Sequence, residues 1–261
     1  MNRAARFWLI IFVIMAVLTT AGYFIAPVFG DGSRSEGMSF EKGGAFGLGY
    51  DVIGRPIFPQ LLSGGILLLF TSVITAIFTI LLGSSFGMMM AAAKNEMKLL
   101  RFFLDVILVM PMMILMLAFF QAFKGSLYSI IPIAAILSLP YYSRYYEKTT
   151  KPLMKTGFYE YARISGKSSL NALVQEIVPI LKKNILTDLG STFIGSCYMI
   201  SAVSFLGAST GSEGFIWSVM VAENISGLAL NPWASFAPII AIIFLTAPVN
   251  FFIDSLERKN D

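Results

Sequence analysis

Few residues in this chain have the types and spacing that bond-making chemistry needs. The 261 residues include no histidine and one cysteine, Cys197, which lies in an apolar run. These counts exclude a disulfide within the chain, a His-based catalytic triad and a zinc site. The sequence also lacks the phosphate-cradling pattern G-x-x-x-x-G-K-[ST], so we expect no nucleotide to bind through that motif. We therefore predict no catalytic residue, no metal ligand and no cofactor bound by this chain.

The most polar stretch, Glu160 to Pro179, has chemistry suited to docking rather than catalysis. It reads EYARISGKSSLNALVQEIVP, and strongly apolar sequence lies on both sides of it. We expect a short helix over 158–165, a turn at Gly166, and a second helix that is capped by Ser168 or Ser169 and leads to Pro179. The apolar residues recur at spacings near three and four, as in a helix, and are Tyr161, Ile164, Leu170, Leu173, Val174 and Ile177.

A short amphipathic helix of this kind suits either of two roles. It can dock a soluble partner, or it can lie on lipid headgroups, which would attract Lys151, Lys155 and Lys167. The residue types alone leave both roles open.

The elements that must position this stretch are membrane helices. Hydrophobic residues make up 56% of the chain and charged residues 13%, too few to cover a soluble globule. Pro56, Pro59 and Gly64–Gly65 predict a loop or interfacial turn before residue 66. We predict an all-α membrane protein with six transmembrane helices, over about 7–29, 66–92, 106–123, 125–143, 189–212 and 236–253.

The distribution of basic residues predicts the orientation. Of the 19 lysine and arginine residues, 15 fall in the segments that share a side with the N-terminus. By the positive-inside rule both termini and the 144–183 loop are then cytoplasmic. We divide the chain into residues 1–64, the first transmembrane helix plus an extracytoplasmic segment, and residues 65–261, a core with five transmembrane helices.

Three motifs resemble those of a known family. Glu160, Ala162, Gly166, Ile177 and Pro179 match the cytoplasmic E-A-A…G…I-L-P signature of permease subunits of bacterial ABC importers, with Tyr161 and Val178 as departures. LGYDVIGR, residues 48–55, resembles the L-G-T-D-x-x-G-R motif of the oligopeptide, dipeptide and nickel permeases. Pro56 and Pro59–Gln60 depart from that pattern. The segments SFLG at 204–207, Trp217 and NPW at 231–233 also match in order and spacing.

The resemblance implies that the 158–165 helix, lying between spans four and five, is a coupling helix seated in a groove of an ATP-hydrolysing subunit. Glu160 would pair with a basic residue there, or simply stabilise the first helical turn. Tyr161 and Ile164 would be apolar anchors, or would face lipid. Gly166 would let the loop turn tightly.

The resemblance also implies the partners. They are a second, homologous permease subunit forming a heterodimer, two ATP-binding subunits that hold ATP and Mg, an extracytoplasmic substrate-binding protein and membrane lipid, with no nucleic acid. The chain would be a multi-pass subunit of the bacterial cytoplasmic membrane and not itself an enzyme. The substrate stays open between a peptide, nickel and a metal-chelating small molecule.

Two further groups of residues are candidates for contact with solute or with the binding protein. Hydroxyl side chains enrich the fifth predicted span, either to line a polar pathway or to let helices approach closely; they are Ser191, Thr192, Ser196, Ser201 and Ser204. Trp217, Glu223 and Trp233 are placed to face the binding protein, although the two tryptophans also suit interfacial anchoring.

A self-contained secondary transporter is the main alternative, and a membrane-embedded hydrolase is the second. Ion-coupled transporters place ionisable groups within the membrane. Here Asp105, Asp188 and Asp254 all fall at the cytoplasmic ends of predicted spans. A hydrolase would need a His-based metal site or paired carboxylates in the spans, which the sequence lacks.

Overall fold

The computed structural model describes residues 3–93, 97–123, 127–207 and 216–257, and these are helical almost throughout. The long helices are α1 (Arg3–Ile25), α2 (Ile57–Ala92), α5 (Leu127–Leu153), α8 (Val178–Gly207) and α10 (Trp233–Glu257). Shorter helices are α3 (Lys98–Val109), α4 (Met112–Ala122), α6 (Gly157–Ile164), α7 (Ser169–Ala172) and α9 (Trp217–Asn224). The remaining helical turns are η1 (Ala26–Phe29), η2 (Ala45–Gly47), the π-helical η3 (Leu173–Ile177) and η4 (Ile225–Gly227).

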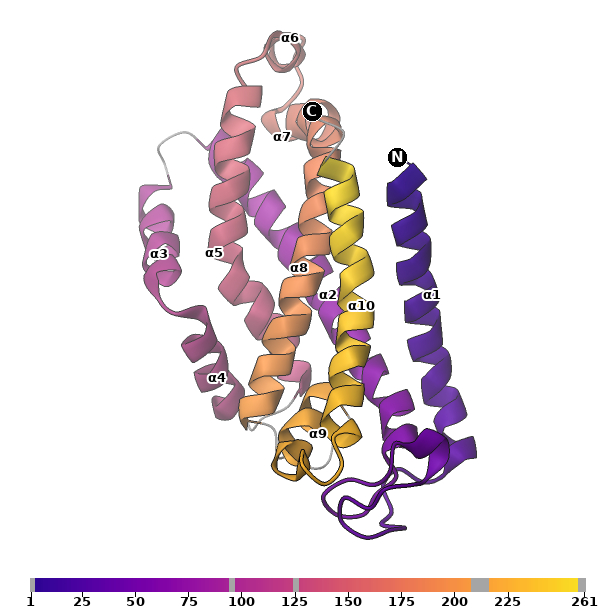
Figure 1. Ribbon diagram of the computed structural model, residues 1–261. Coiled ribbons are helices and arrows are strands. Elements are labelled where there is room, and N and C mark those ends of the chain that lie inside the picture. The colour runs from indigo at the N-terminus through magenta and orange to yellow at the C-terminus, as the bar shows by residue number, and fades with distance from the viewer. Residues whose placement is uncertain (1–2, 94–96, 124–126, 208–215, 258–261) are drawn as a thin grey trace.

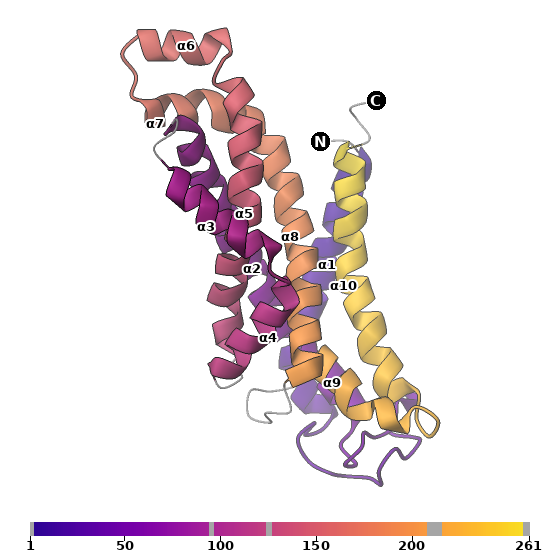
Figure 2. The ribbon, with the colours of Figure 1, turned by 90° about the vertical axis from the view of Figure 1, so that its left-hand side faces the viewer.

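The helices form an elongated bundle with two distinct ends. The start of α1, the end of α10 and the helices α6 and α7 lie at one end, as Figures 1 and 2 show. The 30–56 segment and α9 lie at the opposite end. The structure therefore brings both ends of the described chain to the end that carries α6.

Four helical stretches are long and apolar enough to cross a membrane. They are Arg3–Phe29, Ile57–Ala92, Ser169–Leu206 and Trp233–Glu257. A fifth crossing is possible if α3 and α4, which bend by 93° between them, count as one broken span. The prediction of an all-α membrane protein is confirmed, with four to five candidate spans among the described residues.

Two sequence predictions need correction. The uninterrupted span over 106–123 is wrong, because Met110 and Pro111 are extended and separate α3 from α4. Proline lacks an N–H, and its ring disfavours helical geometry in the residue before it. The loop before residue 66 is also wrong, since α2 already begins at Ile57 with Pro56 as its N-cap. Pro59 is tolerated because it lies in the first turn, where an N–H has no helical partner.

The centre of the bundle is the contact between α2 and α5. A Cβ atom on Gly83 would overlap Tyr142, and one on Gly87 would lie 2.6 Å from the Tyr146 Cβ. The two glycines therefore let the α5 backbone approach α2 closely, as small residues do between membrane helices. This glycine–tyrosine seam places α5 along α2 even though Pro132, Pro140 and Pro152 lie within α5.

Candidate functional site

The short helix α6 presents an apolar face at the end of the bundle where both ends of the described chain lie (Figure 1). Tyr161 is 74% exposed and Ile164 is 86% exposed, whereas Tyr159 and Ala162 are buried. Tyr159 and Ala162 pack in a small hydrophobic cluster with Tyr146 of α5 and with residues of α7, η3 and α8. One face of α6 thus packs against the rest of the protein, and the opposite face is exposed.

Hydrogen bonds and a left-handed glycine fix the position of α6. The hydroxyls of Tyr159 and Ser169 lie 3.0 Å apart. Gly166, with φ +89°, ends the helix in a conformation that L side chains rarely adopt, so the turn predicted there is confirmed. Ser168 accepts a hydrogen bond from the Asn171 N–H at 3.2 Å, which confirms the predicted cap.

The other residues of the cytoplasmic signature lie in three different settings. Glu160 is exposed in the first turn of α6, where both of its predicted roles are available. Ala162 faces inward, so it holds α6 in place rather than offering surface. Pro179 lies in the first turn of α8, directly after the π-helical turn η3, and the helix runs on through it into the bundle.

A buried charged cluster lies in the bundle just below α6. The Glu147 side chain is 2% exposed. Its carboxylate forms ion pairs with Arg101 at 2.9 Å, with Arg144 at 3.0 Å and with Lys151 at 2.8 Å. Arg144 also pairs with Asp105 of α3 at 2.5 Å. The cluster therefore joins α3 to α5. The sequence predictions did not include this cluster, although Arg144 and Glu147 are three residues apart and Glu147 and Lys151 four, the spacings of ion pairs on a helix face.

The hydroxyl residues of α8 do not share one surface. Thr192, Ser196 and Ser204 are buried, Ser201 is partly buried and Ser191 is exposed. Thr192 donates to the Asp188 carbonyl at 2.6 Å and lies 2.5 Å from the Tyr142 hydroxyl of α5. The buried members have the setting of helix-packing residues, whereas Ser191 lies at the surface and Ser201 lines an open apolar pocket with Tyr198 and Phe205.

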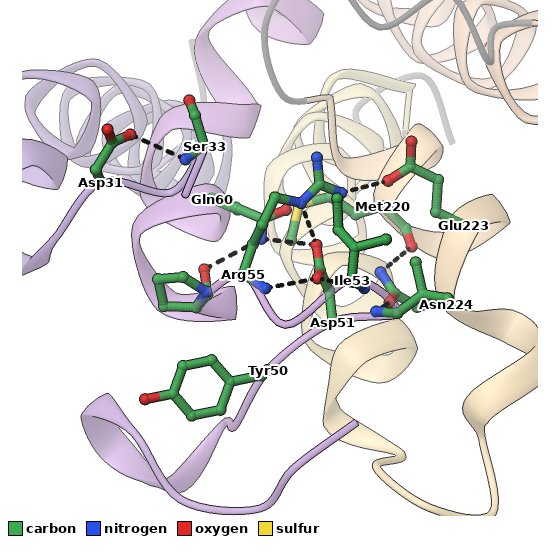
Figure 3. Close-up of polar contacts among 12 residues, drawn as sticks. Asp31, Ser33, Tyr50, Asp51, Ile53, Arg55, Gln60, Met220, Glu223 and Asn224 are labelled. Atoms are coloured by element: carbon green, nitrogen blue, oxygen red, sulfur yellow. Dashed lines mark hydrogen bonds and ion pairs between the residues drawn. The ribbon is translucent and has the colours of Figure 1, made fainter. Parts of the chain in front are cut away.

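At the opposite end, a second polar cluster fastens the 48–55 motif to α2 and α9 (Figure 3). Asp51 is fully buried, and its carboxylate accepts from Arg55 Nε at 2.5 Å and from Gln60 Nε2 at 3.0 Å. It also accepts from the Arg55 N–H at 2.8 Å. Arg55 extends to Glu223 of α9 at 2.7 Å. We call Asp51, Arg55, Gln60 and Glu223 the outer clamp.

Two asparagines complete this attachment. The Asn224 side chain accepts from the Val52 N–H at 2.9 Å. The Asn231 side chain donates to the Leu48 carbonyl at 2.9 Å and to the Tyr50 carbonyl at 3.2 Å. These contacts join the 48–55 motif to the 231–233 motif and to α9. The sequence gives no direct signal for Asn224, because its partner lies 172 residues away.

The charge state of Arg55 reflects its place in the outer clamp. Partial burial alone would lower the pKa of its guanidinium. Hydrogen bonding and charge attraction from Asp51, and then from Glu223, outweigh that effect and leave the pKa raised. Arg55 is thus a permanent cation that neutralises the buried Asp51.

The three residues expected to face the binding protein differ in exposure. Trp217 is 5% exposed, its ring lies against Gly64 and Gly65, and it donates to the Leu61 carbonyl at 2.7 Å. Trp217 is therefore a packing residue, and its prediction as a surface residue needs correction. Glu223 is partly exposed and Trp233 is exposed.

Substituting Gly65 tests this packing. We expect Gly65→Ala to lower the midpoint of thermal unfolding in detergent by several degrees, because the added Cβ would overlap the Trp217 ring. Gly195→Ala is the matched control, since a Cβ there meets nothing within 4 Å. Equal midpoints for the two variants would contradict the proposed contact. The measurement is size-exclusion chromatography after heating at a series of temperatures.

The described residues contain no group of three or more His, Cys, Asp or Glu side chains placed to hold a metal ion. The two polar clusters pair acidic with basic side chains. The arrangement is that of a bundle of membrane helices, with the exposed face of α6 at one end and the 48–55 segment fastened to α2 and α9 at the other.

Known proteins resemble the whole chain. It is 24% identical over 264 residues to a putative peptide transport system permease protein of Brucella abortus, covering 100% of this chain and 88% of the relative. It is 23% identical over 268 residues to a glutathione transport system permease protein of Shigella dysenteriae, covering 100% and 86%. A glutathione transport system permease protein of Pectobacterium atrosepticum is 23% identical over 215 residues, covering 82% and 71%.

Residues 83–261, more than half of the chain, match the family described as binding-protein-dependent transport system inner membrane component. This match includes α5, α6 and α8 and confirms the resemblance to importer permeases and the location in a membrane. The chain therefore belongs to the family of inner membrane components of binding-protein-dependent transport systems.

Proposed function

We propose that the chain is a permease subunit of an ATP-driven importer, that it forms half of a translocation pathway, and that it couples to ATP-binding subunits through α6. The observation that carries the proposal is the exposed apolar face of α6, formed by Tyr161 and Ile164. A tyrosine and an isoleucine so exposed on one short helix are typical of a docking surface. ATP and Mg would be held by the partner subunits.

The position of α6 favours a soluble partner over lipid headgroups. α6 lies beyond the end of α10 and the start of α1 in both ribbon views (Figures 1 and 2). Those two helix ends carry Arg3, Arg6 and Glu257, charged residues of the kind that mark a membrane–water boundary. A helix beyond that boundary meets water or protein rather than the bilayer.

The proposed topology has six spans with both termini in the cytoplasm. The spans are α1, α2, the bent pair α3–α4, α5, α8 and α10. An even number of crossings agrees with the placement of both described chain ends at the end of the bundle that carries α6 (Figures 1 and 2). The excess of lysine and arginine at that end supports its assignment to the cytoplasm.

The substrate we propose is a peptide or a related small solute. The names of the Brucella and Shigella relatives, which refer to peptide and to glutathione transport, support this class. The only support for nickel or a metal chelate as substrate is the resemblance of the 48–55 motif to the oligopeptide, dipeptide and nickel permeases. The outer end, with Glu223 and Trp233 at its surface, would meet the substrate-binding protein, and a second permease subunit would complete the pathway.

Co-purification with the ATP-binding subunits tests the proposal. We expect the intact chain to retain these subunits in detergent and a Tyr161→Ser/Ile164→Ser variant to lose them, because the apolar anchors are gone. Leu170→Ser is the matched control, since Leu170 is an exposed apolar residue of α7 outside the α6 face.

Retention by the intact chain and the control, with loss from the double variant, would support docking through α6. Retention by the double variant at the level of the intact chain would contradict it. If the intact chain retains no ATP-binding subunit, a self-contained transporter becomes the better description. Each variant must elute as a single folded species before the comparison is made.

A further inference from the structure

An apolar cavity lies between α1, α2, α8 and α10. Its volume is about 190 Å³. Aliphatic and aromatic side chains line it almost completely, among them Leu9, Phe12, Ala76, Leu186, Leu189 and Phe252. For comparison, an engineered apolar cavity of about 150 Å³ stays dry and binds benzene. Water is therefore a poor occupant, because it would find no hydrogen-bond partner on these walls.

The cavity is accessible from the bilayer. Leu186 is 40% exposed and Ile77 is 41% exposed, so two of the lining residues reach the surface of the bundle. The surface at this height consists of membrane-spanning helices, and the neighbouring solvent is lipid. An acyl chain can therefore enter without crossing a polar layer.

Basic side chains lie one helical turn from the cavity on two of its walls. Arg6 precedes Leu9 by three residues on α1, and Lys182 precedes Leu186 by four residues on α8. Residues at these spacings share one face of a helix. Arg6 and Lys182 are both exposed, and both lie toward the end of the bundle that carries α6.

The charge balance around this opening is positive. Arg3, Arg6, Lys182 and Lys183 lie on α1 and α8, against three acidic residues, which are Asp188 of α8 and Asp254 and Glu257 of α10. An anionic group held near the opening would be attracted by this balance, at roughly 1 kcal/mol per nearby basic residue.

We propose that this cavity holds an acyl chain of an anionic phospholipid from the cytoplasmic leaflet, with the headgroup phosphate at Arg6 and Lys182. The walls select a hydrocarbon chain, and the two cations select an anionic headgroup. The occupant would fill the space between α1 and α8 and so fasten α1 to the rest of the bundle. The proposal uses the orientation proposed above only to name the leaflet.

Native mass spectrometry of the full chain in detergent tests this site. The protein is mixed with equal amounts of phosphatidylglycerol and phosphatidylcholine that carry the same acyl chains, and the retained lipids are counted. We expect phosphatidylglycerol to be retained in roughly five- to thirtyfold preference, as one or two nearby cations would give. Equal retention of the two lipids would overturn the proposal.

Matched variants separate the headgroup contacts from general surface charge. Arg6→Gln/Lys182→Gln should abolish the preference, whereas Lys98→Gln/Lys155→Gln, with the same change in charge on α3 and beside α6, should leave it unchanged. An equal fall in both double variants would overturn the headgroup site.

The acyl-chain contact has its own pair of variants. Leu186→Trp puts bulk at the mouth of the cavity and should reduce retention of both lipids. Ile180→Trp, at a similarly exposed site of α8 outside the cavity, should not. Normal retention by Leu186→Trp would overturn the proposal. Because lipid retention is measured apart from ATPase co-purification, this proposal and the proposed function can fail independently.

Discussion

Replacing Asp51 by alanine is expected to destabilise the folded protein by about 3–5 kcal/mol, the usual cost of removing one partner from a buried ion pair. Asp51 is fully buried, and its loss would leave Arg55 without its nearest counter-charge and would remove one of the two acceptors of the Gln60 amide. The 48–55 segment would then detach from the start of α2 and from α9. We expect the thermal midpoint in detergent to fall by roughly 6–20 °C.

Limited proteolysis from the side proposed to be extracytoplasmic locates the change. In right-side-out vesicles a protease should cut the 48–55 segment of Asp51→Ala faster than that of the unmodified protein. Asp31→Ala is the control, because the Asp31–Arg34 pair is exposed and such pairs contribute about 0–1 kcal/mol. If the two variants showed the same midpoint, the outer clamp would not be a stabilising element.

Glu147→Gln should have the second large effect, again about 3–5 kcal/mol. Glutamine keeps the shape of the side chain but removes the charge that Arg101, Arg144 and Lys151 share. Three cations would then face one another around a buried neutral amide. The expected result is a lower thermal midpoint together with faster cleavage of the 154–156 connection, which lies between α5 and α6.

Asp105→Asn is the comparison for this cluster. The Asp105 side chain is about half exposed and pairs with Arg144 alone, so its loss should cost no more than about 1 kcal/mol. A cost for Glu147→Gln as small as that of Asp105→Asn would show that solvent reaches the cluster. A Glu147→Gln/Arg144→Gln variant should recover part of the lost stability, since two cations rather than three would then face the neutral amide, while half-exposed Asp105 loses its partner.

Local patterns in the sequence predict α6 and its surroundings well. The spacing of Tyr161 and Ile164, the glycine at 166 and the cap at Ser168 each depend on neighbouring residues, and the structure has them as predicted. The assignment to a membrane and the helical class likewise follow from composition summed over long segments. These features need no knowledge of distant contacts.

Where the sequence predictions were wrong or incomplete, the local conformation depends on contacts between residues that are far apart in the sequence. Gly64 and Gly65 look like turn residues until Trp217, more than 150 residues later, fills the space above them. Pro111 breaks a helix, whereas Pro140 lies inside α5, where the contact with α2 keeps the helix intact. The outer clamp joins residues 168 positions apart, and the residue types at 55 and 223 do not reveal that pairing.

The glycine–tyrosine seam between α2 and α5 has a consequence for biosynthesis. Gly83 and Gly87 leave the ribosome 59 residues before Tyr142 and Tyr146, an interval of roughly 3–12 s at usual translation rates. During that time α2 stands in the translocon or the bilayer with an open groove and with Thr75 and Thr79 uncovered. The α3–α4 pair, synthesised in between, bends at Pro111 and leaves the groove vacant. The groove of α2 at Gly83 and Gly87 is therefore filled only after α5 has been synthesised.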